Sequence, residues 1–453
     1  MGVTQTERML AQYCERSFLK LWSYANPHKD DGHELCDLLA VFENHVFIFF
    51  DREMTLDPTS DKDPQVLWDR WRRSAIDKQV KTAHGAERYL RSGRSVFLDA
   101  KAKSSFPIPI NIDSAIFHKI VVAHGAKEAC ERASDSNVYG SIGISYSESE
   151  VSASFPFLVN VDRRAIVHIF DSHNLPIIFD ELDTVYDFAK YLDTKTAAVQ
   201  RYDVLSYAGE EDLLAHYFLN FDEVSKRHVI GPRDQSVNMV MIGEGEWRDF
   251  ENSNTYAATR KANVDSYFWD ELIQRTCENA INGTLTGNSE LPRGPSAIAE
   301  MAKEPRFMRR VLVEKIKEAV VEFPEATGGI QRKVTFLPSY HEGSAYVFLQ
   351  LNAPPEFRSK PDYRQKRQAL LEIACGAAKH KFPLLKKVIG IAIDAPKYVR
   401  ENSEDFILLP CEEWSEEMHA HYVKANEGFE FFQSDTLVSK SLKASEFINT
   451  EPQ

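Results

Sequence analysis

The chain lacks the features of a secreted, disulfide-bonded or membrane-spanning protein. Its six cysteines are scattered along 453 residues and never form a CxxC pair, so neither a disulfide framework nor a zinc site of that type is expected. Residues Met1 to Glu15 lack the basic and apolar blocks of a signal peptide, and no apolar run approaches the roughly 18 residues of a membrane span. We therefore expect a cytoplasmic protein with reduced thiols and no membrane partner.

Motifs of three common enzyme classes are also missing. The sequence has no GxxxxGK[ST] loop, no GxGxxG turn and no GxSxG elbow, which argues against an NTPase, a dinucleotide-dependent enzyme and a typical serine hydrolase. His118, His124 and His168 lie in or beside apolar runs, but no set of His, Cys and Asp residues has the spacing of a zinc site. Packing or surface roles are the simpler interpretation of these histidines.

What the sequence does contain is enough apolar material for more than one core. The hydrophobic fraction is 43%, with 28 Phe, 17 Tyr and 6 Trp, whereas single domains usually stop growing at roughly 250 to 300 residues. The pattern of helices and strands predicts an α/β protein. We expect a first domain over residues 1–175, a helical extension or linker over 176–260 and a second α/β domain over 261–453.

The N-terminal region has a defined order of predicted elements. Apolar residues at helical spacing predict a helix over 6–22. Two apolar runs, 34–42 and 46–53, are separated by a short polar stretch and predict a β-hairpin. A second helix is expected over 68–89, followed by strands near 95–98, 119–123 and 165–170. The order is therefore helix, strand, strand, helix, strand.

Three carboxylates lie in or at the ends of the two hairpin strands. Asp37 belongs to the first apolar run, and Asp51 and Glu53 end the second. Residues two apart in a strand face the same side of the sheet. Together the three side chains would form the oxygen-only set that Mg²⁺ prefers, with water and a phosphate completing its coordination.

This arrangement resembles the PD-(D/E)XK, or restriction-endonuclease-like, nuclease superfamily over roughly the first hundred to 170 residues. Glu15 matches the acid of the first helix, Asp37 the strand Asp, and Asp51-Arg52-Glu53 the last element of the motif. The resemblance implies a mixed sheet flanked by helices and cleavage of DNA or RNA, with DNA favoured, using Mg²⁺ or Mn²⁺. Bacterial antiviral defence is the setting that this resemblance favours, and the same fold also serves repair and recombination.

The sequence departs from the family where the motif has Lys, because Glu53 stands there. The basic group of the site would then be Lys78 or Lys81 on the following helix, or Arg52. The alternative is a catalytically inactive protein that keeps the fold and serves as a binding or scaffold protein.

A basic segment interrupts a chain whose net charge is −14. Between Arg70 and Arg94 there are eight basic residues against two acidic ones, which is typical of a phosphate-binding surface. A solvated helix whose Trp68 and Trp71 belong to the core is the competing interpretation. The C-terminal half would serve in recognition, regulation or homo-oligomerisation. The candidate nucleic-acid-binding residues are Arg70, Arg72, Arg73, Lys78, Lys81 and Arg88.

Overall fold

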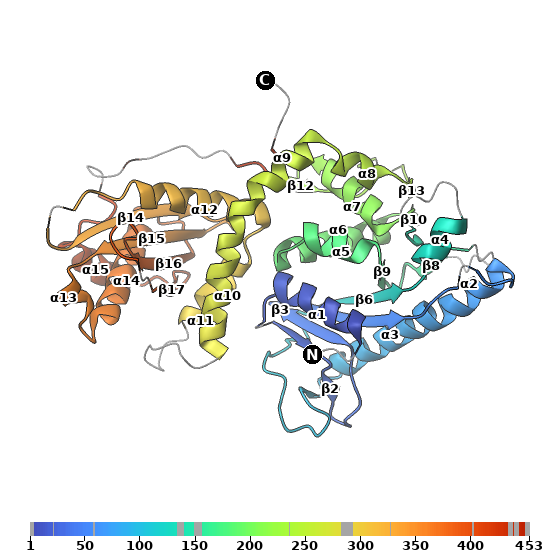
Figure 1. The fold of residues 1–453 in the computed structure, drawn as a ribbon. Helices are drawn as coiled ribbons and strands as arrows, with labels where there is room; N and C mark the ends of the chain where they lie inside the picture. Colours follow the sequence, from blue (N-terminus) through green and yellow to red (C-terminus); the bar gives the residue numbers. More distant parts are fainter. Residues whose placement is uncertain are drawn as a thin grey trace. The chain divides into compact units, whose positions relative to one another are not determined.

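The structure is a computed structural model, and it divides into two compact units, Met1–Ser253 and Asn254–Gln453. Each unit packs helices on mixed β-sheets (Figure 1), which confirms the predicted two-domain α/β class. The residues that the structure describes are 4–20, 22–57, 59–133, 140–148, 156–234, 236–281, 293–326, 328–400, 403–433, 438 and 444–448.

The main sheet of the first unit has five strands in the order β1-β3-β4-β6-β9. Strands β1, β3 and β4 are antiparallel neighbours, whereas β6 and β9 continue the sheet in parallel with β4. The predicted hairpin is therefore present, but its first strand begins one residue after Asp37. The strands are β1 (Ser23–Ala25), β3 (Leu38–Phe42), β4 (His45–Glu53), β6 (Ile116–His124) and β9 (His168–Asp171).

Side-chain alternation gives this sheet two apolar faces. Phe47 and Phe49 face an aromatic cluster that includes Phe18, Phe179 and Phe188. Val46, Ile48 and Phe50 face the opposite way, toward α3. The first face is covered by α1 (Gln5–Ser17), α5 (Asn174–Glu181) and α6 (Val185–Arg201), and the second by α3 (Lys78–Arg91) (Figure 1).

The predicted helix over 68–89 is present but contains a π-helical segment. It consists of α2 (Pro64–Arg72), η1 (Arg73–Asp77) and α3. Trp68 and Trp71 are 0% and 2% exposed, and their rings stack at 5.3 Å. Both tryptophans therefore belong to the core and are not available to stack on bases.

A second sheet of the first unit has the strand order β13-β10-β7-β8. Because β10 pairs with both β7 and β13, the segment that follows residue 175 is part of the first unit, and the division of the chain falls after Ser253 rather than at 175 and 260. The further elements are β2 (His28–Lys29), β5 (Val96–Phe97), α4 (Lys127–Ala133), β7 (Gly143–Ser147), β8 (Leu158–Asp162), β10 (Val204–Tyr207), α7 (Glu210–Leu219), β11 (Phe221–Asp222), β12 (Arg227–His228), β13 (Met239–Ile242) and α8 (Glu246–Glu251).

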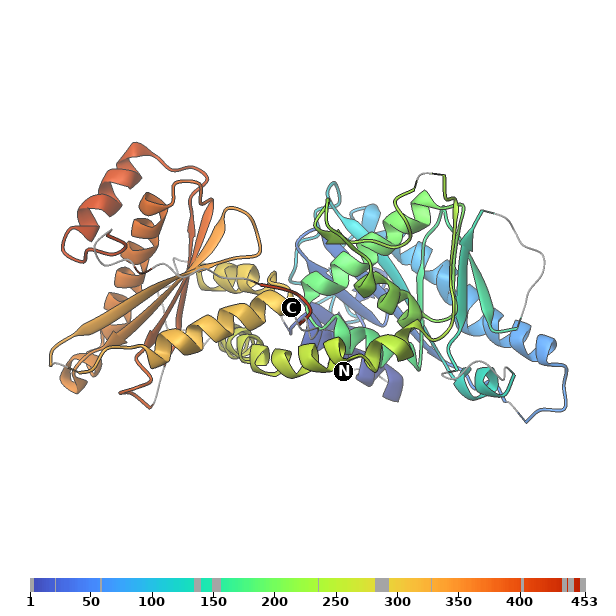
Figure 2. The ribbon, with the colours of Figure 1, turned by 90° about the horizontal axis from the view of Figure 1, so that it is seen from above.

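The second unit is a four-stranded sheet between helices, with strand order β14-β15-β16-β17. A hairpin, a helix and a strand parallel to the second hairpin strand follow one another, the same order as β3, β4, α3 and β6. Figure 2 shows α12 and the pair α14 and α15 on opposite sides of the sheet. The elements are α9 (Asn254–Asn263), η2 (Val264–Ser266), α10 (Tyr267–Ile281), α11 (Arg293–Ala302), α12 (Arg306–Val321), β14 (Gln331–Pro338), β15 (Ser344–Asn352), α13 (Pro355–Arg358), α14 (Tyr363–Lys381), β16 (Lys387–Asp394), β17 (Asp405–Pro410) and α15 (Glu416–Asn426).

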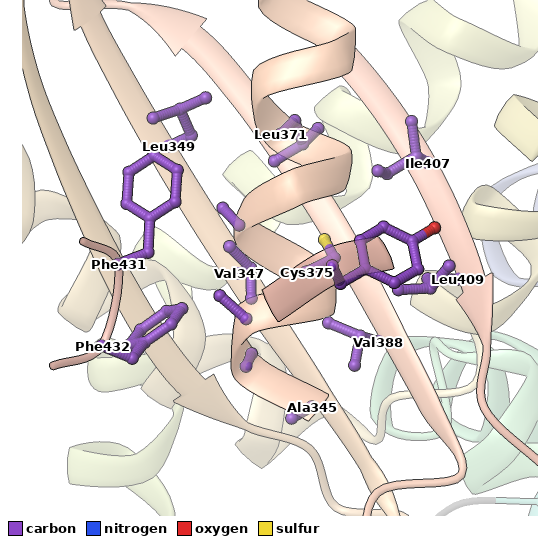
Figure 3. Packing of buried hydrophobic residues seen from close by; sticks show 14 of the residues in the cluster. Ala345, Val347, Leu349, Leu371, Cys375, Val388, Ile407, Leu409, Phe431 and Phe432 are labelled. Atoms are coloured by element: carbon purple, nitrogen blue, oxygen red, sulfur yellow. The ribbon is translucent and has the colours of Figure 1, made fainter. Parts of the chain in front are cut away.

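Side chains of α14 and α15 fill the core of the second unit. Leu371 and Cys375 of α14 pack on Val347 and Val388 of the sheet (Figure 3). Tyr422 of α15 is buried in the same cluster. Helices α14 and α15 and the sheet are therefore held together by close apolar packing.

The close approach of α15 to α14 predicts the effect of Gly376→Ala. In a helix this change ordinarily stabilises by about 1 kcal/mol, but a Cβ at Gly376 would overlap the ring of Tyr422. That ring is fixed, since its hydroxyl donates to Glu372 at 3.0 Å and it stacks on Trp414 at 5.3 Å. We expect a net loss of about 1–2 kcal/mol in urea unfolding.

The matched control is Gly428→Ala, where a Cβ would meet nothing within 4 Å. This variant should unfold as wild type does. A Gly376→Ala protein as stable as wild type would contradict the packing described for α14 and α15.

No helix in the described part of the chain is long and apolar enough to cross a membrane.

Candidate functional site

The structure brings Asp37 and Asp51 together at one end of the β3–β4 hairpin. The backbone N–H of Asp51 donates to Asp37 Oδ2 at 2.6 Å, and the N–H of Asp37 donates to the carbonyl of Phe49 at 3.1 Å. Asp37 is half-buried, and the side chain of Asp51 is fully shielded from solvent. This hydrogen bond brings the carboxylate of one predicted acid, Asp37, against the backbone of the other, Asp51.

The pKa of Asp37 reflects this crowded surrounding. Its pKa is raised from the ordinary value to about 7, mainly by burial and also by the charges of Glu34, Glu7 and Asp51, against the lowering effect of the Asp51 N–H. Glu7 lies in the first turn of α1, where it forms a capping box with Thr4. A divalent cation would relieve the repulsion among these carboxylates.

The helix acid that acts on Asp37 is therefore Glu7, and not the predicted Glu15. Glu15 lies further along α1, is exposed, and its charge raises the pKa of the buried Cys14 thiol. The resemblance to the nuclease family predicted an acid on the first helix. It could not predict which turn of that helix lies beside the end of the strand. Glu7 could have been found as the third residue after the N-cap Thr4 in a T-x-x-E capping box.

A histidine from the neighbouring parallel strand meets Asp51. His124 Nε2 lies 2.6 Å from Asp51 Oδ1, without the angles of a hydrogen bond, so that neither oxygen of Asp51 has a hydrogen-bond partner. On its other side, His124 Nδ1 lies 3.0 Å from the hydroxyl of Ser172. In the β4–β6 register His124 is directly opposite Glu53. His124 of β6 thus contributes a ring nitrogen next to Glu53, the position at which the PD-(D/E)XK motif has Lys.

Glu53 does not join the two aspartates in a set of three carboxylates. It is exposed at the end of β4, as is Arg52. Among the described residues, the only group of three or more metal-ligating side chains with ligand atoms within 4.8 Å of one another is His45, His118 and Asp193. The predicted metal-ligand set of Asp37, Asp51 and Glu53 is accordingly reduced to its first two members.

A further buried carboxylate, Asp171, ends the next parallel strand, and a second, Glu211, belongs to the first turn of α7. Asp171 ends β9 and accepts the N–H groups of Ile142, His173 and Asn174 at 2.8–3.0 Å; burial raises its pKa. Burial also raises the pKa of Glu211 to about 8, and the charge of Asp171 adds to this. The carboxyl ends of β4, β6 and β9 therefore gather acids and a histidine at one sheet edge, where ligands of parallel sheets usually bind.

The predicted basic residues lie on α2, η1 and α3 and are mostly exposed. Arg72 is the exception, half-buried with its Nε 3.6 Å from Asp77. Lys78 and Lys81 begin α3, which packs on the face of the sheet opposite the one that Asp51 faces by strand alternation. The sheet therefore lies between these lysines and the Asp51 carboxylate. The exposed members are Arg70, Arg73, Lys78, Lys81 and Arg88.

The raised pKa of Asp37 predicts how stability depends on pH without metal. Between pH about 4 and 7 the folded chain keeps a proton at Asp37 that the unfolded chain has lost, so stability falls as pH rises through this window. Glu211 and Asp212, with pKa values raised to about 8 and about 6, act in the same direction. The variant Asp37→Asn isolates the first contribution.

The measurement is the urea midpoint at pH 5 and pH 8 in a chelating buffer. Wild type should lose more stability than Asp37→Asn between the two values. Equal losses would mean that Asp37 is not protonated in the folded chain at pH 5.

Comparison with protein-family models, with curated proteins and with solved structures found no match.

Proposed function

We propose that the first unit is a metal-dependent nuclease that hydrolyses phosphodiester bonds, with DNA as its preferred substrate and Mg²⁺ or Mn²⁺ as its cofactor. The observation that carries the proposal is the pair of carboxylates at the end of the β3–β4 hairpin, Asp37 and Asp51, joined by the N–H of Asp51. The order α1, β3, β4, α3 and β6 supports it, since this is the order expected from the resemblance.

The donor set fits Mg²⁺ with two protein ligands. Mg²⁺ usually keeps several waters and is bound through one or two carboxylates plus substrate phosphates. Asp51 offers the buried oxygen Oδ2, which has no hydrogen-bond partner, while its Oδ1 lies 2.6 Å from His124 Nε2. Asp37 offers the oxygen that does not accept the Asp51 N–H. When bound, the ion would neutralise charge on the phosphate and make its water more acidic.

The remaining side chains would position groups and handle protons. His124 Nε2 beside Asp51 is placed to hold a proton at the site, and Ser172 at His124 Nδ1 fixes the orientation of the ring. In this proposal His124 has the role that was predicted for Lys78, Lys81 or Arg52. Glu53 is left as an exposed residue at the end of β4.

Nucleic acid would be held by the exposed basic residues of α2 and η1, Arg70 and Arg73, because α3 with Lys78, Lys81 and Arg88 lies on the other side of the sheet from the Asp51 carboxylate. Each phosphate contact from Lys or Arg releases a counterion, so binding should weaken steeply with salt. The net charge of −14 for the whole chain argues against nonspecific binding over the whole surface. The setting that we propose from the resemblance is antiviral defence in the bacterial cytoplasm, with the second unit in recognition, regulation or assembly of a homo-oligomer.

The alternative is a protein that keeps the nuclease fold but binds without cleaving. The absence of a Lys at position 53 and the exposure of Glu53 favour it. The two proposals differ in whether the carboxylate pair binds metal. Crowded carboxylates without a cation repel one another and reduce stability, so bound metal should stabilise the nuclease.

Thermal unfolding at pH 8 with and without Mg²⁺ or Mn²⁺ tests the metal site. At saturating metal we expect the melting temperature of wild type to rise by about 5 °C. Asp37→Ala should remove the rise, and Asp113→Ala, which removes an exposed carboxylate elsewhere in the unit, should keep it. A rise of equal size in all three proteins would place the metal away from Asp37.

A further inference from the structure

A second group of possible ligands lies at the opposite end of β4 from Asp51. His45 begins β4, His118 lies near the start of β6, and Asp193 belongs to α6. His45 Nδ1 is 3.0 Å from His118 Nε2, and His118 Nε2 is 3.6 Å from Asp193 Oδ1. Asp51 lies six positions along β4 from His45, a distance of roughly 20 Å. The two groups of side chains are therefore separate sites.

These spacings suit coordination of a small ion. Ligand atoms about 2.0–2.1 Å from a tetrahedral ion lie roughly 3.3 Å apart, and the two measured distances lie on either side of this value. One ligand atom from each of the three residues fits within 4.8 Å of the others. The three elements that carry them are packed together, since Phe47 of β4 contacts both the ring of His118 and Phe188 of α6.

The charge state of the histidines also suits metal binding, which requires neutral imidazole. The pKa of His118 is lowered to about 3, mainly by burial and also by the charges of His45 and Lys119. Burial lowers the pKa of His45 as well, although Asp193 and Glu43 oppose this. Both rings are thus unprotonated at neutral pH and can offer lone pairs.

We propose that His45, His118 and Asp193 bind one divalent transition-metal ion of the zinc type, with the fourth coordination position open to water. Two imidazole nitrogens and one carboxylate oxygen form a mixed ligand set, which suits such ions better than it suits Mg²⁺. His118 is almost fully buried, whereas the side chains of His45 and Asp193 are 17% and 38% exposed. The exposed members give the ion and its water a path to solvent, and the bound ion ties α6 to β4 and β6.

A site without metal would hold the same side chains by other contacts. His45 and His118 would share a hydrogen bond, and Asp193 Oδ2 would stay 4.0 Å from His45 Nε2. The two interpretations differ in the stoichiometry of bound metal and in the effect of removing one ligand.

The test uses the full chain without a histidine tag, stripped of metal and then titrated with Zn²⁺, and separately with Co²⁺ as a spectroscopic probe. We expect one Zn²⁺ per chain and the visible absorption of four-coordinate Co²⁺. His45→Gln and Asp193→Asn are chosen because both residues are partly exposed and the variants should fold. Each should weaken Zn²⁺ binding by more than about 100-fold, beyond the effect of losing an outer-shell partner.

Two controls separate this site from the rest of the unit. His84→Gln removes a half-buried histidine of α3, and Asp37→Ala removes a ligand of the proposed Mg²⁺ site; both should bind Zn²⁺ as wild type does. If wild type binds no Zn²⁺, or if His45→Gln and Asp193→Asn bind it unchanged, the proposal is overturned. Loss of binding in Asp37→Ala with retention in Asp193→Asn would assign the zinc to the carboxylate pair instead.

Discussion

Glu210→Gln is expected to lower the free energy of unfolding by about 3–5 kcal/mol. Glu210 and Lys195 form an ion pair at 2.7 Å whose side chains are both 0% exposed. Glu210 also accepts the hydroxyl groups of Tyr191 and Tyr207 at 2.7 and 2.8 Å. Removal of its charge leaves the Lys195 ammonium among aromatic rings with no carboxylate, and an uncompensated buried charge is strongly destabilising.

Urea unfolding of three proteins measures this effect. The double variant Lys195→Met with Glu210→Gln removes both charges and should be more stable than Glu210→Gln alone, because the cost lies in the unpaired charge rather than in the lost attraction. Burial lowers the pKa of Lys195, so the stability of a variant with an unpaired Lys195 should fall as pH falls toward that lowered pKa, because the unfolded chain binds a proton that the folded chain does not. If Glu210→Gln unfolds within about 1 kcal/mol of wild type, the buried Lys195 does not depend on Glu210 as its partner.

The second large effect is expected at Asp51. Asp51→Asn removes a charge from a buried position and should reduce metal-dependent cleavage by about 10³-fold, equivalent to several kcal/mol of transition-state stabilisation. The variant keeps the size of the side chain and the backbone N–H that holds Asp37. Single-turnover cleavage of a labelled duplex with saturating Mg²⁺ measures the loss.

The matched control is Glu53→Gln, which neutralises an exposed carboxylate on the same strand. A change of less than about tenfold is expected there, since Glu53 lies outside the carboxylate pair. Melting curves of both variants show whether any loss of activity reflects unfolding. Equal losses in Glu53→Gln and Asp51→Asn would return Glu53 to the metal site.

The local elements near the candidate site were predictable from the sequence. Two apolar runs separated by a short polar stretch predicted the β3–β4 hairpin, and a hairpin by itself fixes which residues lie across from each other. The approach of Asp37 to Asp51 was therefore within reach of the sequence.

The partners that come from parallel strands were not predictable in the same way. The contact of His124 with Asp51 depends on the register of β6 on β4, which no turn between the two strands specifies. Strand β14 was not predicted. It has only one buried residue and lacks a clear alternation of buried and exposed residues. β10 was missed too, and with it the pairing that joins the segment after residue 175 to the first unit.

Cleavage assays with and without Mg²⁺ test the proposed nuclease most directly. Supercoiled plasmid, linear duplex DNA, single-stranded DNA and RNA would each be incubated with wild type and with Asp37→Ala, in Mg²⁺, in Mn²⁺ and in chelator. The proposal predicts cleavage of DNA by wild type that requires the metal and is lost in Asp37→Ala. Absence of metal-dependent cleavage of every substrate, or equal cleavage by wild type and Asp37→Ala, would contradict it.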